Sequence, residues 1–168
     1  MVIGSGGSGK STLSRKLGEI TGIPVIHLDS LYWQPGWVEP DKEEWRDTMA
    51  REIERPSWIM DGNFGGTREM RMRAADTVIF LDLPRWLCML RVLKRRLTHT
   101  GETRPDMAEG CPEKVDLKFL AWVWTYKRRS GRRVLEELSA MPHKRLIRLR
   151  TRHEVAAFLE DPYAYKAG

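Results

Sequence analysis

Residues 4–12 read GSGGSGKST, and this stretch decides the fold. It matches the pattern G-x-x-x-x-G-K-[ST], in which glycines let successive backbone amides turn toward a chain of phosphates. Lys10 brings a compact positive charge to the terminal phosphates, and the Ser11 hydroxyl is a ligand for Mg²⁺. An apolar strand precedes the loop, and an amphipathic helix follows it with its positive end at the phosphates. The stretch predicts a site for a nucleoside triphosphate such as ATP, bound by Gly4, Ser5, Gly6, Gly7, Ser8, Gly9, Lys10, Ser11 and Thr12.

Apolar, β-rich runs alternate with helical patterns along the rest of the chain. Such alternation is typical of βαβ units and therefore predicts an α/β protein with a parallel sheet. Strands are expected at Met1–Ile3, Val25–Leu28, Trp58–Asp61, Thr77–Leu83 and Leu146–Leu149. Helices are expected at Lys10–Ile20, Asp41–Glu54, Pro84–Leu97, Glu113–Lys127, Arg132–Met141 and Arg152–Glu160.

The chain length and two long connections define the domain organisation. The chain has 168 residues, which suits one domain over residues 1–168. Two segments interrupt the alternation of strands and helices. The first is Ser30–Pro40, which is rich in Trp and Pro, and the second is the polar insert Thr98–Pro112. Long connections in a compact domain are often lids or binding loops. We therefore expect a lid over about residues 98–121.

Composition excludes several classes of protein. Apolar residues make up 41% and charged residues 31%, which excludes a disordered chain. The two cysteines exclude a disulfide framework and do not form a zinc pattern. No apolar run approaches the roughly 20 residues of a membrane span, and the N-terminus lacks a signal-peptide pattern, so we expect a cytoplasmic protein without membrane contact. The net charge of +6 favours anionic partners such as nucleotides or nucleic acid.

Acidic residues follow the predicted strands. Asp29 ends the second strand and Asp61 ends the third, beside the glycine-rich loop. Asp61, with Ser11, is expected to hold Mg²⁺ through water. Asp29 is expected to orient or deprotonate an acceptor hydroxyl. Asp82 also ends a strand, but we interpret it as a structural residue, and we interpret His27 as a core or turn histidine.

Arginines are placed to meet the phosphates. Arg91 and Arg95 lie four residues apart, so they share one face of a helix. Guanidinium groups stabilise the charge that spreads over a phosphoryl group during its transfer, and they also stack on purines. Arg104 lies in the polar insert. The cluster Lys127, Arg128, Arg129, Arg132 and Arg133 is either a solvated basic face or a surface that binds anions.

Together these residues resemble the nucleoside-monophosphate-kinase and shikimate-kinase group of P-loop kinases. Within that group the chain is similar to the bacterial topology-modulation proteins, a family related to adenylate kinases. The matching stretches are GSGGSGKST (residues 4–12), HLDSLYWQPGW (27–37), WIMDGNFGGTREMR (58–71), ADTVIFLDLPR (75–85), RVLKRR (91–96) and RPDMAEGCPEKVDL (104–117). The resemblance implies a three-layer P-loop NTPase fold, with a five-stranded parallel sheet and an Arg-rich lid insert.

The resemblance also implies roles for single residues. The pair Asp61-Gly62 is similar to the Asp-Gly pair near Mg²⁺ in adenylate kinases. Arg91 is similar to the arginine that stacks on adenine, and Arg95 is similar to the arginine that contacts the phosphates. Together with the positions described above, we expect the catalytic residues to be Lys10, Asp29, Asp61 and Arg95. The Thr151–Glu154 loop is placed to border the base.

The acceptor side departs from adenylate kinases. Those enzymes follow Asp-Gly with Phe-Pro-Arg, whereas this chain continues with Asn63-Phe64-Gly65. Arg68 and Arg71 are the nearest arginines, and we expect the acceptor to be bound by Asp29, Arg71 and Arg104.

Three functions are compatible with these patterns. The first is a Mg²⁺-dependent phosphotransferase that moves the γ-phosphoryl group of ATP to a small molecule. The second is a nucleotide-gated regulator that binds DNA or protein and has only weak ATPase activity. The third is a degenerate ATPase that only hydrolyses ATP. The sequence does not name the acceptor.

Overall fold

The computed structural model describes residues 1–98, 106–112 and 115–165. Within them, one five-stranded sheet is parallel throughout and has the strand order β2-β3-β1-β4-β5. This confirms the expected five-stranded parallel sheet. Its strands are β1 (Val2–Gly4), β2 (Val25–His27), β3 (Ile59–Asp61), β4 (Thr77–Leu81) and β5 (Arg145–Leu149).

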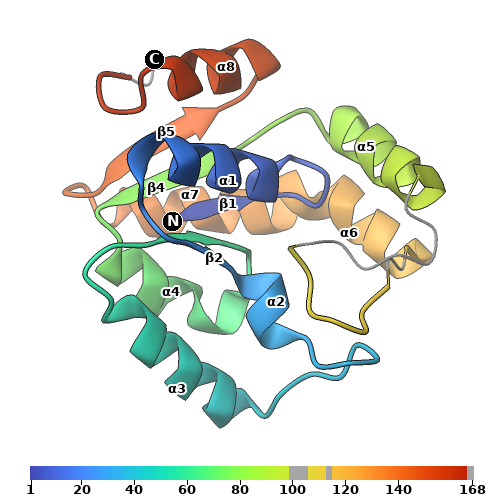
Figure 1. Ribbon diagram of the computed structural model, residues 1–168. Coiled ribbons are helices and arrows are strands. Elements are labelled where there is room, and N and C mark those ends of the chain that lie inside the picture. Colours follow the sequence, from blue (N-terminus) through green and yellow to red (C-terminus); the bar gives the residue numbers. More distant parts are fainter. Residues whose placement is uncertain (99–105, 113–114, 166–168) are drawn as a thin grey trace.

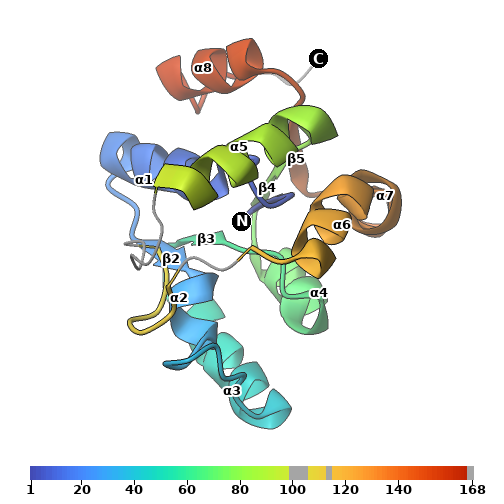
Figure 2. The ribbon, with the colours of Figure 1, turned by 90° about the vertical axis from the view of Figure 1, so that its right-hand side faces the viewer.

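Helices cover both faces of the sheet and give three layers (Figures 1 and 2). On one face lie α1 (Lys10–Thr21) and α8 (Arg152–Glu160), which pack through Leu13, Leu17 and Phe158. The other face is covered by α4 (Gly65–Ala74), α6 (Leu117–Tyr126) and α7 (Arg132–Ser139). A π-helix, η1 (Lys127–Gly131), joins α6 to α7.

Alternation along the strands assigns each side chain to one layer. Ile79 of β4 joins the cluster under α1 and α8, whereas its neighbours Val78 and Phe80 join the cluster under α4, α6 and α7. Strand side chains point alternately to opposite faces, so a strand covered on both faces is apolar throughout. The apolar runs of the sequence therefore encode the buried centre of the sheet.

The remaining helices lie at the edges. At the β2 edge, α2 (Leu28–Tyr32) and α3 (Lys42–Ile53) pack around Leu28, Trp45 and Met49. The Asp41 side chain accepts hydrogen bonds from the backbone amides of Glu43 and Glu44 and so caps α3. Across the sheet, α5 (Arg85–Thr98) packs beside α6.

Several predicted boundaries were wrong. The strand β2 ends at His27, so Asp29 belongs to α2 and not to a strand end. The sequence pattern missed both α2 and α4; α4 begins with two glycines and is stabilised by tertiary packing of Met72, whose side chain is fully buried. The helix expected from residue 113 begins at Leu117, where Asp116 caps it through the amide of Phe119.

No helix in the described ranges is long and apolar enough to cross a membrane.

Candidate functional site

A cavity of about 1070 Å³ lies beyond the carboxyl ends of β1, β2, β3 and β4. Open parallel sheets bind ligands at this edge, where the loops that leave the strands converge. The cavity is bordered by the glycine-rich loop after β1, by α5 and α8, and by the two long connections of the sequence. Its walls include Gly6, Gly7, Ser8, Gly9, Lys10, Ser11, Thr12, His27, Asp29, Trp33, Asn63, Phe64, Arg91, Arg95, Asp106, Phe119 and Arg152.

Helices α5 and α6 hold the glycine-rich loop from two sides. A Cβ atom at Gly7 would lie 2.3 Å from the carbonyl oxygen of Cys88 in α5, and the backbone φ of Gly7 is +73°. A Cβ atom at Gly6 would lie 2.8 Å from the ring of Phe119 in α6. Arg91 Nη1 donates hydrogen bonds to the carbonyl oxygens of Ser8 (3.1 Å) and Gly7 (3.4 Å). Close approach by neighbouring helices, as well as phosphate binding, therefore requires glycines here.

Lys10 lies at the start of α1 with its ammonium turned back into the loop. Its Nζ donates a hydrogen bond to the carbonyl oxygen of Ser5 at 3.1 Å. Burial lowers the pKa of Lys10, although the carboxylates of Asp29 and Asp61 act in the opposite direction. An amine that lines the cavity at the start of a helix is suited to a polyanion.

Asp61 lies behind the cavity wall and joins two residues that line it. One carboxylate oxygen lies 2.6 Å from His27 Nδ1, and the other lies 3.5 Å from the Ser11 hydroxyl. Its hydrogen bond to Asp61 raises the pKa of His27, and burial opposes this effect. A hydroxyl and a carboxylate side by side at a phosphate loop are oxygen ligands of the kind that Mg²⁺ prefers. The arrangement fits the predicted role of Ser11 and Asp61 in holding Mg²⁺.

Side chains of both charges line the cavity. Among the described residues, the cations that line it come from α1, α5 and α8, whereas the carboxylates come from α2, from the two long connections and from the residue that caps α6. The cations are Lys10, Arg15, Lys16, Arg91, Arg95 and Arg152, and the carboxylates are Asp29, Glu39, Asp106 and Asp116.

The two long connections contact each other beside the cavity. The amide of Gly36 donates to the carbonyl of Gly110 at 3.0 Å, and Trp37 Nε1 donates to the carbonyl of Pro112 at 3.2 Å. Trp33 and Trp37 pack edge to face with ring centroids 5.2 Å apart, and both line the cavity. The described part of the insert thus borders the cavity, and its role as a lid stays a prediction.

Most of the predicted site residues come together. The loop residues from Gly6 to Thr12, together with Asp29, Arg91 and Arg95, line the cavity, whereas Gly4 and Ser5 are buried and are not among the residues that line it. Arg104 lies outside the described residues.

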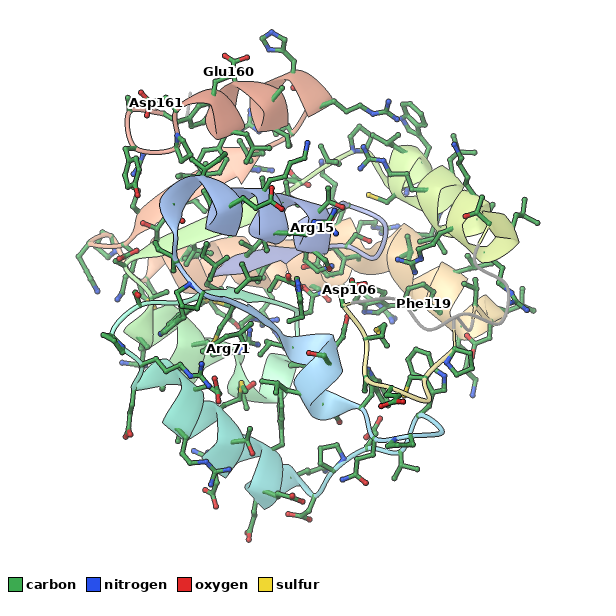
Figure 3. All side chains as sticks on the ribbon, viewed as in Figure 1. Arg15, Arg71, Asp106, Phe119, Glu160 and Asp161 are labelled. Atoms are coloured by element: carbon green, nitrogen blue, oxygen red, sulfur yellow. The ribbon has the colours of Figure 1, made fainter. Side chains whose placement is uncertain are left out.

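Arg71 does not take part in the cavity, which corrects the expectation that it binds the acceptor. Its side chain is fully buried, and its guanidinium donates to the carbonyl oxygens of Gly62, Asn63 and Phe64. Figure 3 shows Arg71 on the α4 side of the molecule, apart from Asp106 and Phe119 at the cavity. Arg68 also faces elsewhere, because both its Nε and Nη2 donate to Glu137.

Sequence reasoning missed several cavity residues. The sequence analysis treats Asn63 as a departure from adenylate kinases, although an amide side chain two residues after a buried strand is a usable signal. Asp106, Phe119 and Trp122 lie far from the glycine-rich loop in sequence, so only the packing of the insert and α6 brings them to the cavity.

Two other charged groups are structural. Asp82 is buried and pairs with Arg148 and with Lys127, as its interpretation as a structural residue predicts. Arg132 pairs with Glu136 on α7. Two members of the basic cluster are therefore engaged within the protein, and binding of nucleic acid stays a prediction.

Comparisons with known proteins bear on the fold. No protein family matches the chain, and no curated protein matches it. The chain is similar to a solved structure of deoxyadenosine kinase from M. mycoides with bound dCTP, with a TM-score of 0.50 and 12% sequence identity over 98% of each chain. A structure of that kinase with bound dATP gives a TM-score of 0.52 and 12% identity over 95% of this chain and 94% of that chain. This likeness confirms the predicted three-layer P-loop fold.

Proposed function

We propose that the protein transfers the γ-phosphoryl group of ATP to the hydroxyl group of a small, unphosphorylated molecule. The lining of the cavity by both cations and carboxylates carries this proposal. A triphosphate is attracted to Lys10, Arg91 and Arg95, and backbone amides of the loop and the start of α1 also face it. A phosphorylated acceptor beside Asp29 and the other carboxylates of the cavity would be repelled.

The residues divide the work of the reaction. Arg95 stabilises the negative charge that spreads over the transferred phosphoryl group, and Lys10 stabilises the negative charge on the phosphates of ATP. The Asp29 carboxylate accepts the proton of the acceptor hydroxyl as that oxygen bonds to the γ-phosphorus. The bond between the γ-phosphorus and the bridging oxygen breaks, and ADP leaves with the bonding electrons. Mg²⁺, held by Ser11 and Asp61, would neutralise charge on the phosphates.

Aromatic side chains in the cavity favour an acceptor with a flat ring. Trp33 and Phe64 line the cavity and offer aromatic surfaces on which a ring can stack. The structurally similar proteins are deoxyadenosine kinases, so a deoxynucleoside is the first class of acceptor to test. The resemblance to topology-modulation proteins and the cytoplasmic location stay predictions from the sequence.

An acceptor screen tests the proposed function. ADP production is measured with Mg²⁺ and ATP in the presence of deoxynucleosides, nucleoside monophosphates, sugars and hydroxy acids. We expect an unphosphorylated hydroxyl compound to raise ADP production above basal hydrolysis. Asp29→Asn should remove this increase and leave the affinity for ATP unchanged, whereas Asp47→Asn, an exposed change on α3, should retain it. A preference for monophosphates, or no response to any acceptor, would contradict the proposal.

A further inference from the structure

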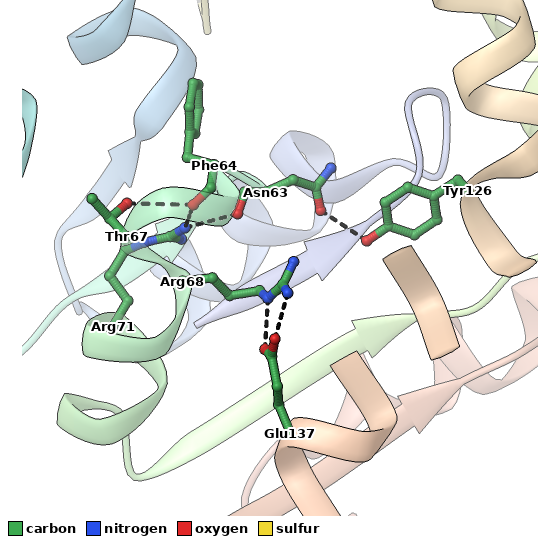
Figure 4. Close-up of polar contacts among 7 residues, drawn as sticks. All are labelled: Asn63, Phe64, Thr67, Arg68, Arg71, Tyr126 and Glu137. Atoms are coloured by element: carbon green, nitrogen blue, oxygen red, sulfur yellow. Dashed lines mark hydrogen bonds and ion pairs between the residues drawn. The ribbon is translucent and has the colours of Figure 1, made fainter. Parts of the chain in front are cut away.

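A strained turn after β3 is held by one buried guanidinium. Phe64 has a backbone φ of +25°, in the left-handed region that bulky residues rarely adopt. Arg71, fully buried on α4, donates from Nη1 to the carbonyl of Gly62 (3.2 Å) and from Nη2 to those of Asn63 (2.8 Å) and Phe64 (2.9 Å). Figure 4 shows Arg71 beside the carbonyls of Asn63 and Phe64. Three successive carbonyls on one cation fix the path of the turn.

This turn directs the Asn63 side chain at the first residue of the glycine-rich loop. Asn63 Nδ2 donates to the carbonyl oxygen of Gly4 at 2.8 Å, and Asn63 Oδ1 accepts from the amide of Gly4 at 3.4 Å. The side-chain amide therefore pairs with both polar backbone groups of Gly4. It acts as the next rung of the β1–β3 ladder, whose strands end at Gly4 and Asp61.

The Asn63 Oδ1 atom also accepts a hydrogen bond from a third segment, α6. The hydroxyl of Tyr126, at the end of α6, donates to Asn63 Oδ1 at 2.8 Å (Figure 4). Tyr126 is buried, and burial raises its pKa, so the hydroxyl keeps the proton that it donates. Since α6 also packs Phe119 and Val123 against Gly6, the loop is held between the turn after β3 and α6.

We infer that Asn63 is a positioning residue for the glycine-rich loop, and that Arg71 sets the geometry of Asn63. The loop is then ordered before any ligand arrives, and binding loses less free energy in ordering it. The inference rests on the proposed function in that the loop binds phosphates. Arg71, which the sequence predicts to bind the acceptor, acts instead through Asn63.

Two measurements on Asn63→Ala test the inference. In the ligand-free protein, amide hydrogen exchange of residues 4–9 should quicken about 10-fold because Gly4 loses its side-chain partner. The dissociation constant for Mg·ADP, measured by calorimetry, should rise about 3- to 10-fold, the range that one or two lost hydrogen bonds produce. Tyr126→Phe, which removes one donor and keeps the ring, should have a smaller effect in the same direction.

Thr67→Ala is the matched control. Thr67 Oγ1 donates to the carbonyl of Phe64 at 3.4 Å, so the variant removes a hydrogen bond from the same turn without touching Gly4. It should lower stability and leave both loop exchange and Mg·ADP affinity within about 2-fold of the unchanged protein. If Asn63→Ala does not fold, Tyr126→Phe and Arg71→Lys give the same two readouts.

The outcomes separate the inference from the proposed function. Unchanged loop exchange in Asn63→Ala, or equal effects in Asn63→Ala and Thr67→Ala, would overturn the inference. If the unchanged protein binds no nucleotide at all, the proposed function fails, and hydrogen exchange of the ligand-free loop still decides the role of Asn63.

Discussion

His27 Nδ1 lies 2.6 Å from a carboxylate oxygen of Asp61, and this contact joins the end of β2 to the end of β3. The two strands are neighbours in the sheet and pair His27 with Asp61 in register. The contact links a residue that lines the cavity to the carboxylate that is expected to serve Mg²⁺.

The contact makes stability depend on pH. Asp61 raises the pKa of His27 above its ordinary value of 6.5, so the folded protein binds this proton more tightly than the unfolded chain. The stabilisation is therefore complete below pH 6.5 and is lost as pH rises through the pKa of the folded state. In urea unfolding without Mg²⁺, His27→Asn should reduce the loss of stability between pH 6 and pH 8. His143→Asn, an exposed change, should leave it unaltered; equal slopes in all three proteins would refute the prediction.

Lys10 is placed for a ligand at a cost to the ligand-free protein. Burial removes water from its ammonium and lowers the pKa of that group. Lys10→Met should raise the free energy of unfolding by about 1 kcal/mol, because an apolar side chain replaces a buried ion. The same variant should bind ATP about 100-fold more weakly, since two charge-assisted hydrogen bonds are lost. Thermal unfolding measures the change in stability, and calorimetry measures the affinity for ATP. Lys42→Met, at an exposed position of α3, is the control.

Gly7 should not tolerate a methyl group. A Cβ atom would lie 2.3 Å from the carbonyl oxygen of Cys88 and would occupy a backbone conformation with φ of +73°. We expect Gly7→Ala to destabilise the protein by about 1–3 kcal/mol, measured by denaturant unfolding. Gly66→Ala is the control, because Gly66 lies in α4 with open space around it, and it should stabilise the helix by up to about 1 kcal/mol. Similar effects at both positions would contradict this account of the loop.

Asp82 should matter for stability and not for ligand binding. Its buried carboxylate pairs with Arg148 and with Lys127, and Asp82→Ala would leave Arg148 without its partner. We expect a loss of about 3 kcal/mol in unfolding free energy with little change in ATP affinity. Glu69→Gln, which breaks the exposed pair with Arg73, should cost less than about 1 kcal/mol. A large loss of ATP affinity in Asp82→Ala would instead place Asp82 in the site.

Local patterns in the sequence were enough to predict the centre of the fold. The glycine-rich loop and the apolar strands report backbone conformation and burial, which depend mainly on residues a few positions apart. The five strands and α8 were therefore predicted within a few residues. Gly6 to Thr12, Asp29, Arg91 and Arg95 were likewise assigned to one cavity in advance.

The partners of the polar side chains were decided only by the tertiary structure. Arg71 carries the same charge as Arg95, and no nearby pattern reveals that the turn after β3 folds back over Arg71 while Arg95 faces the cavity. The hydrogen bonds of His27, Asn63 and Tyr126 depend on how distant segments pack together. The strand β3 lies between β2 and β1, and α6 packs against the glycine-rich loop. A sequence read locally specifies which groups are buried, whereas the crossing of distant segments determines which of them meet.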